Sequence, residues 1–310
     1  MRDYEILVVG GGLAGLTAGL FAARNGRSTL VLEPMIPGGH LANVTKIEDF
    51  PGFPEGVAGY DLGPMVQEQA ASQGAEFQMA EIRGLEAADG DWLVTTDGES
   101  YRAGAVIVAA GSRQRELGVP GEERLRGRGV SHCASCDGPL YRGGTVAVVG
   151  GGDSALQEAL TLADYASRVV LLHRVRALTA QQVYRQRVAD SASISVRPNT
   201  VVEEIFGEDR VSGLRLRDTG SGEEARLEVA GVFVYVGLEP NTAFLQSTLR
   251  LDESGHIPTD IWMRTERPGL FAAGDIRRDS ASQAITSAGD GATAAIAAHR
   301  YLQERSWPDR

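Results

Sequence analysis

Residues 4–33, YEILVVGGGLAGLTAGLFAARNGRSTLVLE, decide the fold of this chain. An apolar run typical of a buried strand leads into GGGLAG at residues 10–15, and an apolar helical stretch follows to about residue 26. The glycines of such a GxGxxG loop allow a tight turn and let a pyrophosphate approach the backbone at the helix N-terminus. A second strand ends at Glu33, where an acidic side chain is expected to bind ribose hydroxyls. The stretch therefore predicts a dinucleotide-binding strand–helix–strand unit.

The same pattern recurs at residues 145–174, TVAVVGGGDSALQEALTLADYASRVVLLHR. Here His173 corresponds to Glu33, because each lies 23 residues after the first glycine of its loop. A carboxylate would repel a 2′-phosphate, whereas His173 followed by Arg174 would attract one, so this unit is expected to prefer NADP to NAD. The alternative is a Rossmann-like unit that keeps its glycines but has lost its ligand. Two nucleotide sites of different preference suggest one flavin and one nicotinamide.

The chain has only two cysteines, Cys133 and Cys136, in SHCASCDGPL at residues 131–140. A zinc site needs about four ligands, and no second CxxC or H-x3-5-H motif supplies them. A structural disulfide across two residues would constrain the unfolded chain little. A redox pair requires this closeness, because one thiol attacks a disulfide and the other resolves the mixed disulfide. The spacing favours a redox pair, with metal binding or coincidence as alternatives.

Length and charge limit the class of protein. The 310 residues suffice for about two domains, and the formal net charge of −11 opposes binding to nucleic acid or to anionic membranes. Residues 6–23 are uncharged and mostly apolar, which is also typical of a signal sequence or a short membrane helix, but the triple glycine fits a strand, a turn and a helix better. We expect a cytoplasmic protein whose partners are small molecules or proteins.

Several stretches together resemble the low-molecular-weight, bacterial-type thioredoxin reductases over nearly the whole chain. They are GGGLAG (10–15), AVIVAAG (105–111), LGVPGEE (117–123), GRGVSHCASCDG (127–138), GGGDSA (150–155), VGLEPNT (236–242) and GLFAAGDIRRDSASQAITSAGDGATAA (269–295). The resemblance implies an α/β fold with two Rossmann-like three-layer domains. An NADP-binding domain, residues 115–241, would interrupt an FAD-binding domain of residues 1–114 and 242–310. The chain would cross between them within residues 111–123 and 236–242.

The resemblance also implies the activity, in which NADPH reduces FAD, FAD reduces the cysteine pair, and the pair reduces thioredoxin or a thioredoxin-like protein. Cys133 would be the exposed nucleophile, Cys136 would face the flavin, and Asp137 would be the acid/base. The protein would be a homodimer. The positions matching FAD-binding residues are Gly10, Gly12, Leu13, Ala14, Gly15, Glu33, Gly39, His40, Leu41, Asp49, Ala110, Gly111, Gly274, Asp275, Gln283 and Ala284. Those matching NADPH-binding residues are Gly150, Gly152, Asp153, Ser154, Ala155, His173, Arg174 and Arg176.

The chain departs from the family pattern at several of these places. Val175 and Thr179 stand where the family's phosphate signature has arginines, and Arg176 is expected to compensate in part. Near the flavin, His40, Asp49 and Ser282 replace the family's Gln, Asn and Arg. His132, directly before Cys133, is also unusual, and a solvated surface residue is expected there, with tuning of the thiol as the alternative. Two alternatives therefore stay open. One is a related enzyme that takes electrons from ferredoxin or another non-nicotinamide donor, and the other is a noncatalytic flavin redox sensor.

Overall fold

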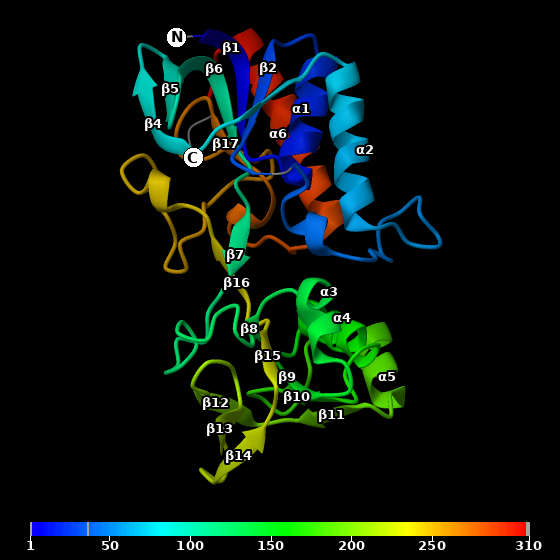
Figure 1. The fold of residues 1–310 in the computed structure, drawn as a ribbon. Coiled ribbons are helices and arrows are strands. Elements are labelled where there is room, and N and C mark those ends of the chain that lie inside the picture. Colours follow the sequence, from blue (N-terminus) through cyan, green and yellow to red (C-terminus); the bar gives the residue numbers. More distant parts are fainter. Residues whose placement is uncertain (1, 36, 308–310) are drawn as a thin grey trace. The chain divides into compact units, whose positions relative to one another are not determined.

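The computed structural model describes residues 2–35 and 37–307 and divides the chain into two units. The first unit consists of Met1–Arg113 and Glu239–Arg310, and the second of Gln114–Leu238. The sequence predicted boundaries after residues 114 and 241. In the structure they fall after residues 113 and 238. The N- and C-terminal parts of the chain thus form one unit, and the second is inserted between them (Figure 1).

The first unit is built on a seven-stranded sheet in the order β3-β2-β1-β6-β5-β4, with β17 also paired to β6. Strands β1, β2, β3, β6 and β17 are parallel, whereas β4, β5 and β6 form an antiparallel meander. The strands are β1 (Arg2–Val9), β2 (Thr29–Glu33), β3 (Glu76–Met79), β4 (Ile82–Ala88), β5 (Asp91–Thr96), β6 (Ser100–Val108) and β17 (Leu270–Ala272). The helices are α1 (Leu13–Arg24), α2 (Gly59–Ser72) and α6 (Ala284–Glu304), with short helices η1 (Gly39–Asn43), η3 (Ala243–Leu245) and η4 (Gly274–Ile276).

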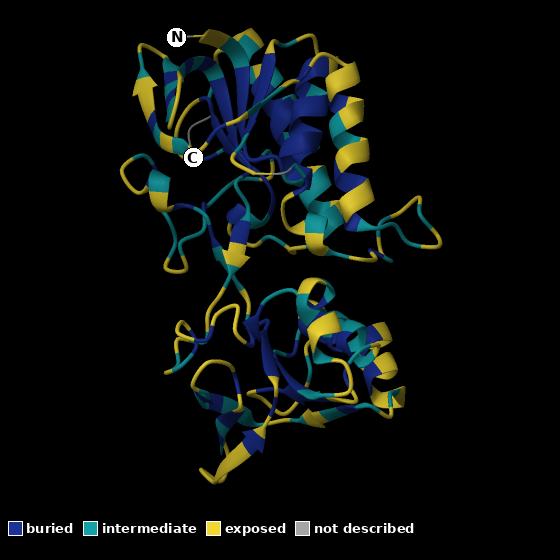
Figure 2. Ribbon diagram, in the orientation of Figure 1, coloured by how far each residue is buried: buried dark blue, intermediate teal, exposed yellow. Residues whose placement is uncertain are grey.

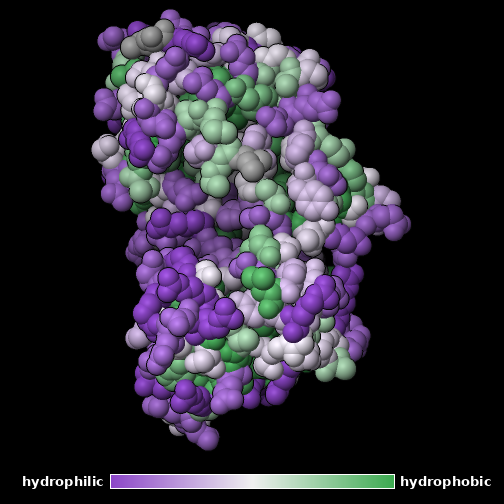
Figure 3. Space-filling view, viewed as in Figure 1, coloured by the Kyte–Doolittle hydropathy of each residue, from purple (hydrophilic) through white to green (hydrophobic). Residues whose placement is uncertain are grey.

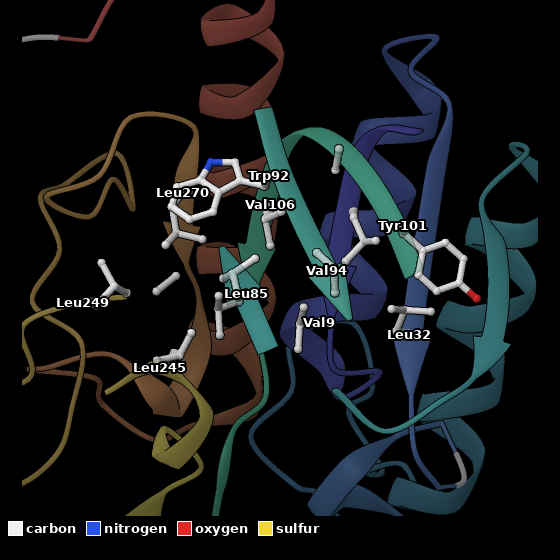
Figure 4. Close-up of a cluster of buried hydrophobic side chains, with 14 of the residues drawn as sticks. Val9, Leu32, Leu85, Trp92, Val94, Tyr101, Val106, Leu245, Leu249 and Leu270 are labelled. Carbon is white, nitrogen blue, oxygen red and sulfur yellow. The ribbon is translucent and has the colours of Figure 1, made fainter. Parts of the chain in front are cut away.

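Successive apolar side chains of β1 point to opposite sides, so both faces of this sheet are apolar. Ile6 and Val8 pack with small residues of α1 and α6, and Leu7 and Val9 pack on the other face. Figure 4 shows the second cluster, in which Trp92 and other side chains of the meander lie near residues of the 245–276 segment. Figure 2 shows that the central strands and α1 are almost wholly buried, while α2 has an exposed outer side. The unit therefore has three layers, with its sheet in the middle.

The second unit has a five-stranded parallel sheet in the order β11-β10-β9-β15-β8. Helices α4 and α5 cover one face, and an antiparallel sheet of β12, β13 and β14 covers the other. The elements are β8 (Val130–Ser131), α3 (Ala134–Asp137), η2 (Gly138–Tyr141), β9 (Thr145–Val149), α4 (Asp153–Ala163), β10 (Arg168–Leu172), α5 (Gln182–Asp190), β11 (Ile194–Arg197), β12 (Thr200–Phe206), β13 (Gly213–Asp218), β14 (Glu224–Glu228) and β15 (Gly231–Val234). The predicted α/β class with two Rossmann-like units is confirmed.

Two short strands carry the chain between the units. They are β7 (Ser112–Gln114) and β16 (Leu238–Pro240), and they pair with each other. Hydrophilic side chains dominate the face of the molecule seen in Figure 3. Among the described residues, no helix has the length and apolar character needed to cross a membrane. The apolar stretch at residues 6–23 forms the second half of β1, a turn and most of α1.

Candidate dinucleotide sites and redox pair

The first glycine loop joins β1 to α1, and its glycines have different physical roles. Gly10 has a φ of 105°, and a Cβ there would overlap the Ala109 carbonyl. A Cβ on Gly15 would overlap the Gly10 carbonyl oxygen, so this position needs glycine for the helix to pack onto the strand. Gly12 differs, because no heavy atom lies within 4 Å of where its Cβ would point. It caps α1 without a side-chain hydrogen bond, which leaves room for a ligand against the first turn of the helix.

Glu33, at the end of β2, is fixed beside this loop. Its Oε2 accepts a hydrogen bond from the Gly11 N–H (2.6 Å), and its Oε1 accepts one from the Met35 N–H (3.1 Å). Leu13 and Ala14 are buried in the first turn of α1, below the open space. η1 packs against the loop, and a Cβ on Gly39 would lie 3.1 Å from the Gly12 Cα.

The chain after β6 forms the next part of this site. The carbonyls of Ala110 and Gly111 accept hydrogen bonds from the Asn241 side chain (2.9 Å) and backbone N–H (3.0 Å). His40 hydrogen-bonds the Ser112 carbonyl through Nε2. The Ser112 hydroxyl is buried and has no hydrogen-bond partner in the structure. Leu41 packs against the small apolar cluster under η1, and Asp49 is exposed in the loop that follows.

Asp275 lies in η4, directly after β17. Its Oδ1 accepts hydrogen bonds from the hydroxyls of Ser287 (3.1 Å) and Ser280 (3.4 Å). Burial raises the pKa of Asp275, and the Ser287 bond and the nearby His40 oppose that rise. Gln283 caps α6 in a reciprocal capping box with the third residue of the helix, and Ala284 is the first helical residue.

These positions share one edge of the first sheet. Gly10, Glu33, Ala109 and Gly274 each lie at or just after the carboxyl end of a parallel strand, β1, β2, β6 or β17. Ligands of open α/β sheets bind outside the carboxyl ends of the strands. Gly10, Glu33 and Gly274 of the predicted set therefore lie at the edge where a dinucleotide would be expected.

The second glycine loop, between β9 and α4, repeats this arrangement. A Cβ on Gly150, which has a φ of 149°, would overlap the Tyr235 carbonyl oxygen and come 2.8 Å from the Cβ of buried Ala155. Gly152 caps α4, and the nearest atom to its Cβ direction is the Thr179 hydroxyl at 3.9 Å. Asp153 accepts hydrogen bonds from the backbone (2.7 Å) and side-chain amide (3.0 Å) of Gln181, and the next residue, Ser154, is exposed.

The cations expected to bind a 2′-phosphate lie in different environments. His173 is 6% exposed, its ring packs against Gly151, and its Nε2 hydrogen-bonds the Ala177 carbonyl (2.7 Å). The imidazole is therefore less accessible to a ligand than the sequence pattern suggested, because its Nε2 is already bonded. Arg174 and Arg176 are both exposed. They are the cations that remain accessible at this strand end.

Val175 and Thr179, which replace family arginines, carry no charge, and they differ in their contacts. Thr179 donates from its hydroxyl (3.1 Å) and its backbone N–H (2.8 Å) to the Gly151 carbonyl, so it supports the glycine loop. Val175 is 47% exposed. An arginine at position 175 would thus add charge without removing a hydrogen bond.

Cys133 and Cys136 form a disulfide at the short helix α3. Cys133 precedes the helix, and its Sγ accepts a hydrogen bond from the Cys136 N–H (3.2 Å) and lies 3.3 Å from the Ser135 hydroxyl. Cys133 is half-buried, whereas Cys136 is exposed. Asp137 follows directly, and its backbone N–H bonds the Cys133 carbonyl. Across residues 2–35 and 37–307, no group of three His, Cys, Asp or Glu side chains could hold a metal ion.

Comparisons with known proteins identify this arrangement. The family model for pyridine nucleotide-disulphide oxidoreductases matches residues 4–292. The thioredoxin reductase of Listeria innocua is 41% identical over 306 residues, which cover 98% of this chain and 95% of that protein. The chain belongs to the thioredoxin reductase family.

Two further relatives bear on fold and partner. A crystal structure of Lactococcus lactis thioredoxin reductase (FR conformation) matches with a TM-score of 0.95 and 36% identity, and covers 97% of this chain and 99% of that one. A protein of Mycobacterium leprae described as a bifunctional thioredoxin reductase/thioredoxin is 41% identical over 305 residues, 98% of this chain and 67% of its own length.

As a thioredoxin reductase family member, the protein is a flavoprotein disulfide reductase with FAD and NADPH as cofactors. The structure offers observations that fit both. The open space at Gly12, the anchored Glu33 and the partnerless buried Ser112 hydroxyl fit a dinucleotide at the first loop. The open space at Gly152 and the exposed Arg174 fit a phosphorylated dinucleotide at the second.

One expectation about the redox turn is wrong. His132 is not a solvated surface residue, because its ring is half-buried and its Nε2 is closed off from solvent without a partner. Burial lowers the pKa of His132, and the nearby Arg126 lowers it further. The neutral imidazole is therefore favoured next to Cys133.

Sequence reasoning did not identify two residues that shape these sites. Asn241 fixes the loop after β6 although it lies 131 positions from Ala110 in the chain. Glu158 accepts a hydrogen bond from the Ala134 N–H (3.1 Å), next to the redox pair. Asn241 lies in the VGLEPNT stretch, but that stretch alone does not reveal which distant segment its side chain contacts, and Glu158 lies outside the short motifs.

Proposed function

We propose that this protein reduces the disulfide of thioredoxin with NADPH. The reaction converts NADPH, a proton and a protein disulfide into NADP⁺ and two thiols, so electrons and protons balance. The observation that carries the proposal is the Cys133–Cys136 disulfide, with one exposed cysteine, in the unit that also contains the second dinucleotide loop. The Mycobacterium leprae relative, which combines both activities in one chain, supports thioredoxin as the partner.

The two units have separate tasks in this proposal. The first unit holds FAD, with the pyrophosphate against the loop at Gly12, the adenosine ribose on Glu33, and the ribityl chain near Asp275. The second unit holds NADPH, with its pyrophosphate at Gly152. FAD, when bound, supplies a carrier that accepts two electrons from a nicotinamide and passes them to a disulfide.

Arg174 and Arg176 are proposed to bind the 2′-phosphate of NADPH. Both are exposed at the end of β10, and a guanidinium binds phosphate through charge-assisted hydrogen bonds. His173 is buried against Gly151 and supports the glycine loop. It also adds to the preference for NADPH over NADH, because it is not acidic. The other positions predicted in the first unit are proposed to contact FAD, and those predicted in the second unit to contact NADPH.

The roles that we propose for the two thiols differ from those implied by the resemblance. Cys136 is the exposed residue of the pair, so we propose that its thiolate attacks the disulfide of the partner and forms a mixed disulfide. Cys133 then attacks the Cys136 sulfur, which releases the partner as a thiolate and restores the Cys133–Cys136 bond. The Cys136 N–H and the Ser135 hydroxyl lie at the Cys133 sulfur and would stabilise the attacking thiolate. Asp137, adjacent to Cys136, is proposed to supply the proton for the departing thiolate.

A trapping experiment tests this assignment. A thioredoxin with one active-site cysteine replaced is activated as a mixed disulfide with thionitrobenzoate, whose release is followed by absorbance. Cys133→Ser should form a stable covalent complex through Cys136, and Cys136→Ser should form little. The reverse result would restore Cys133 as the exchanging thiol. Complex formation by neither variant would exclude thioredoxin as the partner.

We also propose that the protein is a cytoplasmic homodimer. The proposal rests on the family resemblance and on the need of a thiol reductant for a reducing compartment. Analytical ultracentrifugation should give the mass of a dimer at micromolar concentration, and cell fractionation should recover the protein with cytoplasmic markers. A monomer at that concentration, or recovery outside the cytoplasm, would contradict the corresponding part.

A further inference from the structure

Glu158 connects the nucleotide-binding helix α4 with the redox pair. It lies on the second turn of α4, and its Oε2 accepts hydrogen bonds from the Ala134 N–H (3.1 Å) and the Tyr235 hydroxyl (3.4 Å). Ala134 directly follows Cys133 and is the first residue of α3. The carboxylate thus contacts the backbone of the redox turn itself.

The environment of this carboxylate provides hydrogen bonds but no positive charge. Burial raises the pKa of Glu158, and the bonds from Ala134 and Tyr235 oppose that rise. No ion pair that involves Glu158 is found among residues 2–35 and 37–307. The other titratable groups near the turn are His132, Asp137, Tyr141 and Tyr235, and both tyrosines face Asp137. A half-buried carboxylate without a cation keeps more of its electrostatic effect on neighbouring groups than an exposed one.

This charge acts on the reduced form of the pair. When the disulfide takes up two electrons and one proton, it becomes one thiol and one thiolate. At Cys133 the thiolate would gain the Cys136 N–H and the Ser135 hydroxyl, but it would lie one residue from the group that Glu158 contacts. Like charges disfavour each other, so Glu158 destabilises the thiolate and, with it, the reduced pair.

We propose that Glu158 is a positioning residue of the redox pair, which holds the start of α3 through Ala134 and makes the dithiol a stronger reductant through its negative charge. The inference takes the redox role of Cys133 and Cys136 from the proposed function. It identifies Glu158 as one determinant of how strongly the pair reduces a partner.

The first test measures the pH dependence of thiolate formation at Cys133 alone. In the Cys136→Ser holoenzyme Cys133 is the only thiol, so the pH profile of alkylation by iodoacetamide reports its thiolate. Glu158→Gln keeps the size and an oxygen acceptor but removes the charge, and should move the midpoint of this profile down by about one pH unit. Glu158→Asp keeps the charge and should stay near the parent. Tyr235→Phe, the matched control, removes a hydrogen bond to the carboxylate but no charge and should also stay near it.

The second test measures how easily the Cys133–Cys136 disulfide is reduced. The holoenzyme with both cysteines is equilibrated in dithiothreitol buffers of graded composition, and its disulfide is quantified by alkylation and mass spectrometry. Glu158→Gln should be reduced about tenfold more easily, which corresponds to about 30 mV for a two-electron couple. Glu158→Met, a second neutral variant of similar size, should shift in the same direction and provides the test if the glutamine variant does not fold.

An unchanged alkylation profile and an unchanged equilibrium in the neutral variants would overturn the inference, even if their melting temperatures fell, because a merely structural role would alter only stability. A shift in Glu158→Asp as large as in Glu158→Gln would also overturn it, because charge would not be the cause. Failure of the wild-type disulfide to be reduced by any dithiol would instead refute the redox role itself. The two failures are therefore distinguishable, and neither test requires thioredoxin.

Discussion

Replacing Gly12 by alanine should separate FAD binding from the folding of the first unit. Gly12 has a φ of −70° and a ψ of 178°, an extended conformation that alanine adopts freely, and its Cβ would meet no heavy atom within 4 Å. The free energy of unfolding of the FAD-free protein should therefore change by less than about 1 kcal/mol. The new methyl group would instead fill the space proposed for the pyrophosphate.

The expected loss of affinity follows from the hydrogen bonds that the methyl group would prevent. A hydrogen bond from a backbone N–H to a charged phosphate contributes about 1.5–3 kcal/mol. Losing one such bond at the first turn of α1 would weaken FAD binding by roughly 10- to 100-fold. Quenching of flavin fluorescence during titration of the FAD-free protein gives the dissociation constant, and thermal unfolding followed by circular dichroism gives the stability.

Gly15→Ala is the matched control in the same loop. Its Cβ would overlap the Gly10 carbonyl oxygen, and no flexible side chain can move aside. This variant should lose about 3 kcal/mol or more of stability before FAD is added. The reasoning is refuted if Gly12→Ala binds FAD as tightly as the wild type, or if it is destabilised as much as Gly15→Ala.

Three further predictions concern the donor, the fold and the proton. Arg174→Ala should raise KM for NADPH by about 10- to 100-fold and leave NADH use unchanged. Val175→Arg should lower KM for NADPH. Equal effects on both nucleotides in steady-state kinetics would refute the phosphate assignment. Burial, then Arg27, lowers the pKa of His299, so the unfolded state binds more protons and stability should fall as pH drops below about 6.5. His299→Gln should flatten this fall in urea titrations, and an unchanged pH profile would contradict the assignment. Asp137→Asn should slow thioredoxin reduction but not stopped-flow reduction of the flavin by NADPH, and slowing of both would argue against a role confined to thiol exchange.

Local sequence was sufficient to predict a contact when both residues belong to one strand–helix–strand unit. Glu33 meets Gly11 because the length of α1 and its flanking turns brings the end of β2 to the glycine loop. The equal spacing of His173 placed it against Gly151 for the same reason. The pattern could not reveal that the imidazole would be buried with its Nε2 on Ala177, because that bond depends on the course of the chain after β10.

The sequence pattern could not predict contacts between segments that are distant in the chain. A CxxC motif does not specify which cysteine is the more exposed, since this depends on how α3 packs on α4. In the structure Cys136 is exposed and Cys133 is half-buried. The burial of His132 and the contact of Glu158 with Ala134 likewise arise from packing between elements that no short motif connects. Glycine loops are predictable because each imposes a local backbone geometry, but the side chains around a redox turn are not.

The most direct test of the central claim counts thioredoxin thiols against NADPH consumed. The holoenzyme is mixed anaerobically with limiting NADPH and excess oxidised thioredoxin, and the new thiols are titrated after the enzyme is removed. Two thiols should appear for each NADPH oxidised, because the disulfide couple takes two electrons. None should appear with Cys133→Ser or Cys136→Ser. The account is contradicted if NADPH is oxidised without new thiols, if either cysteine variant retains full yield, or if only reduced ferredoxin supports thiol formation.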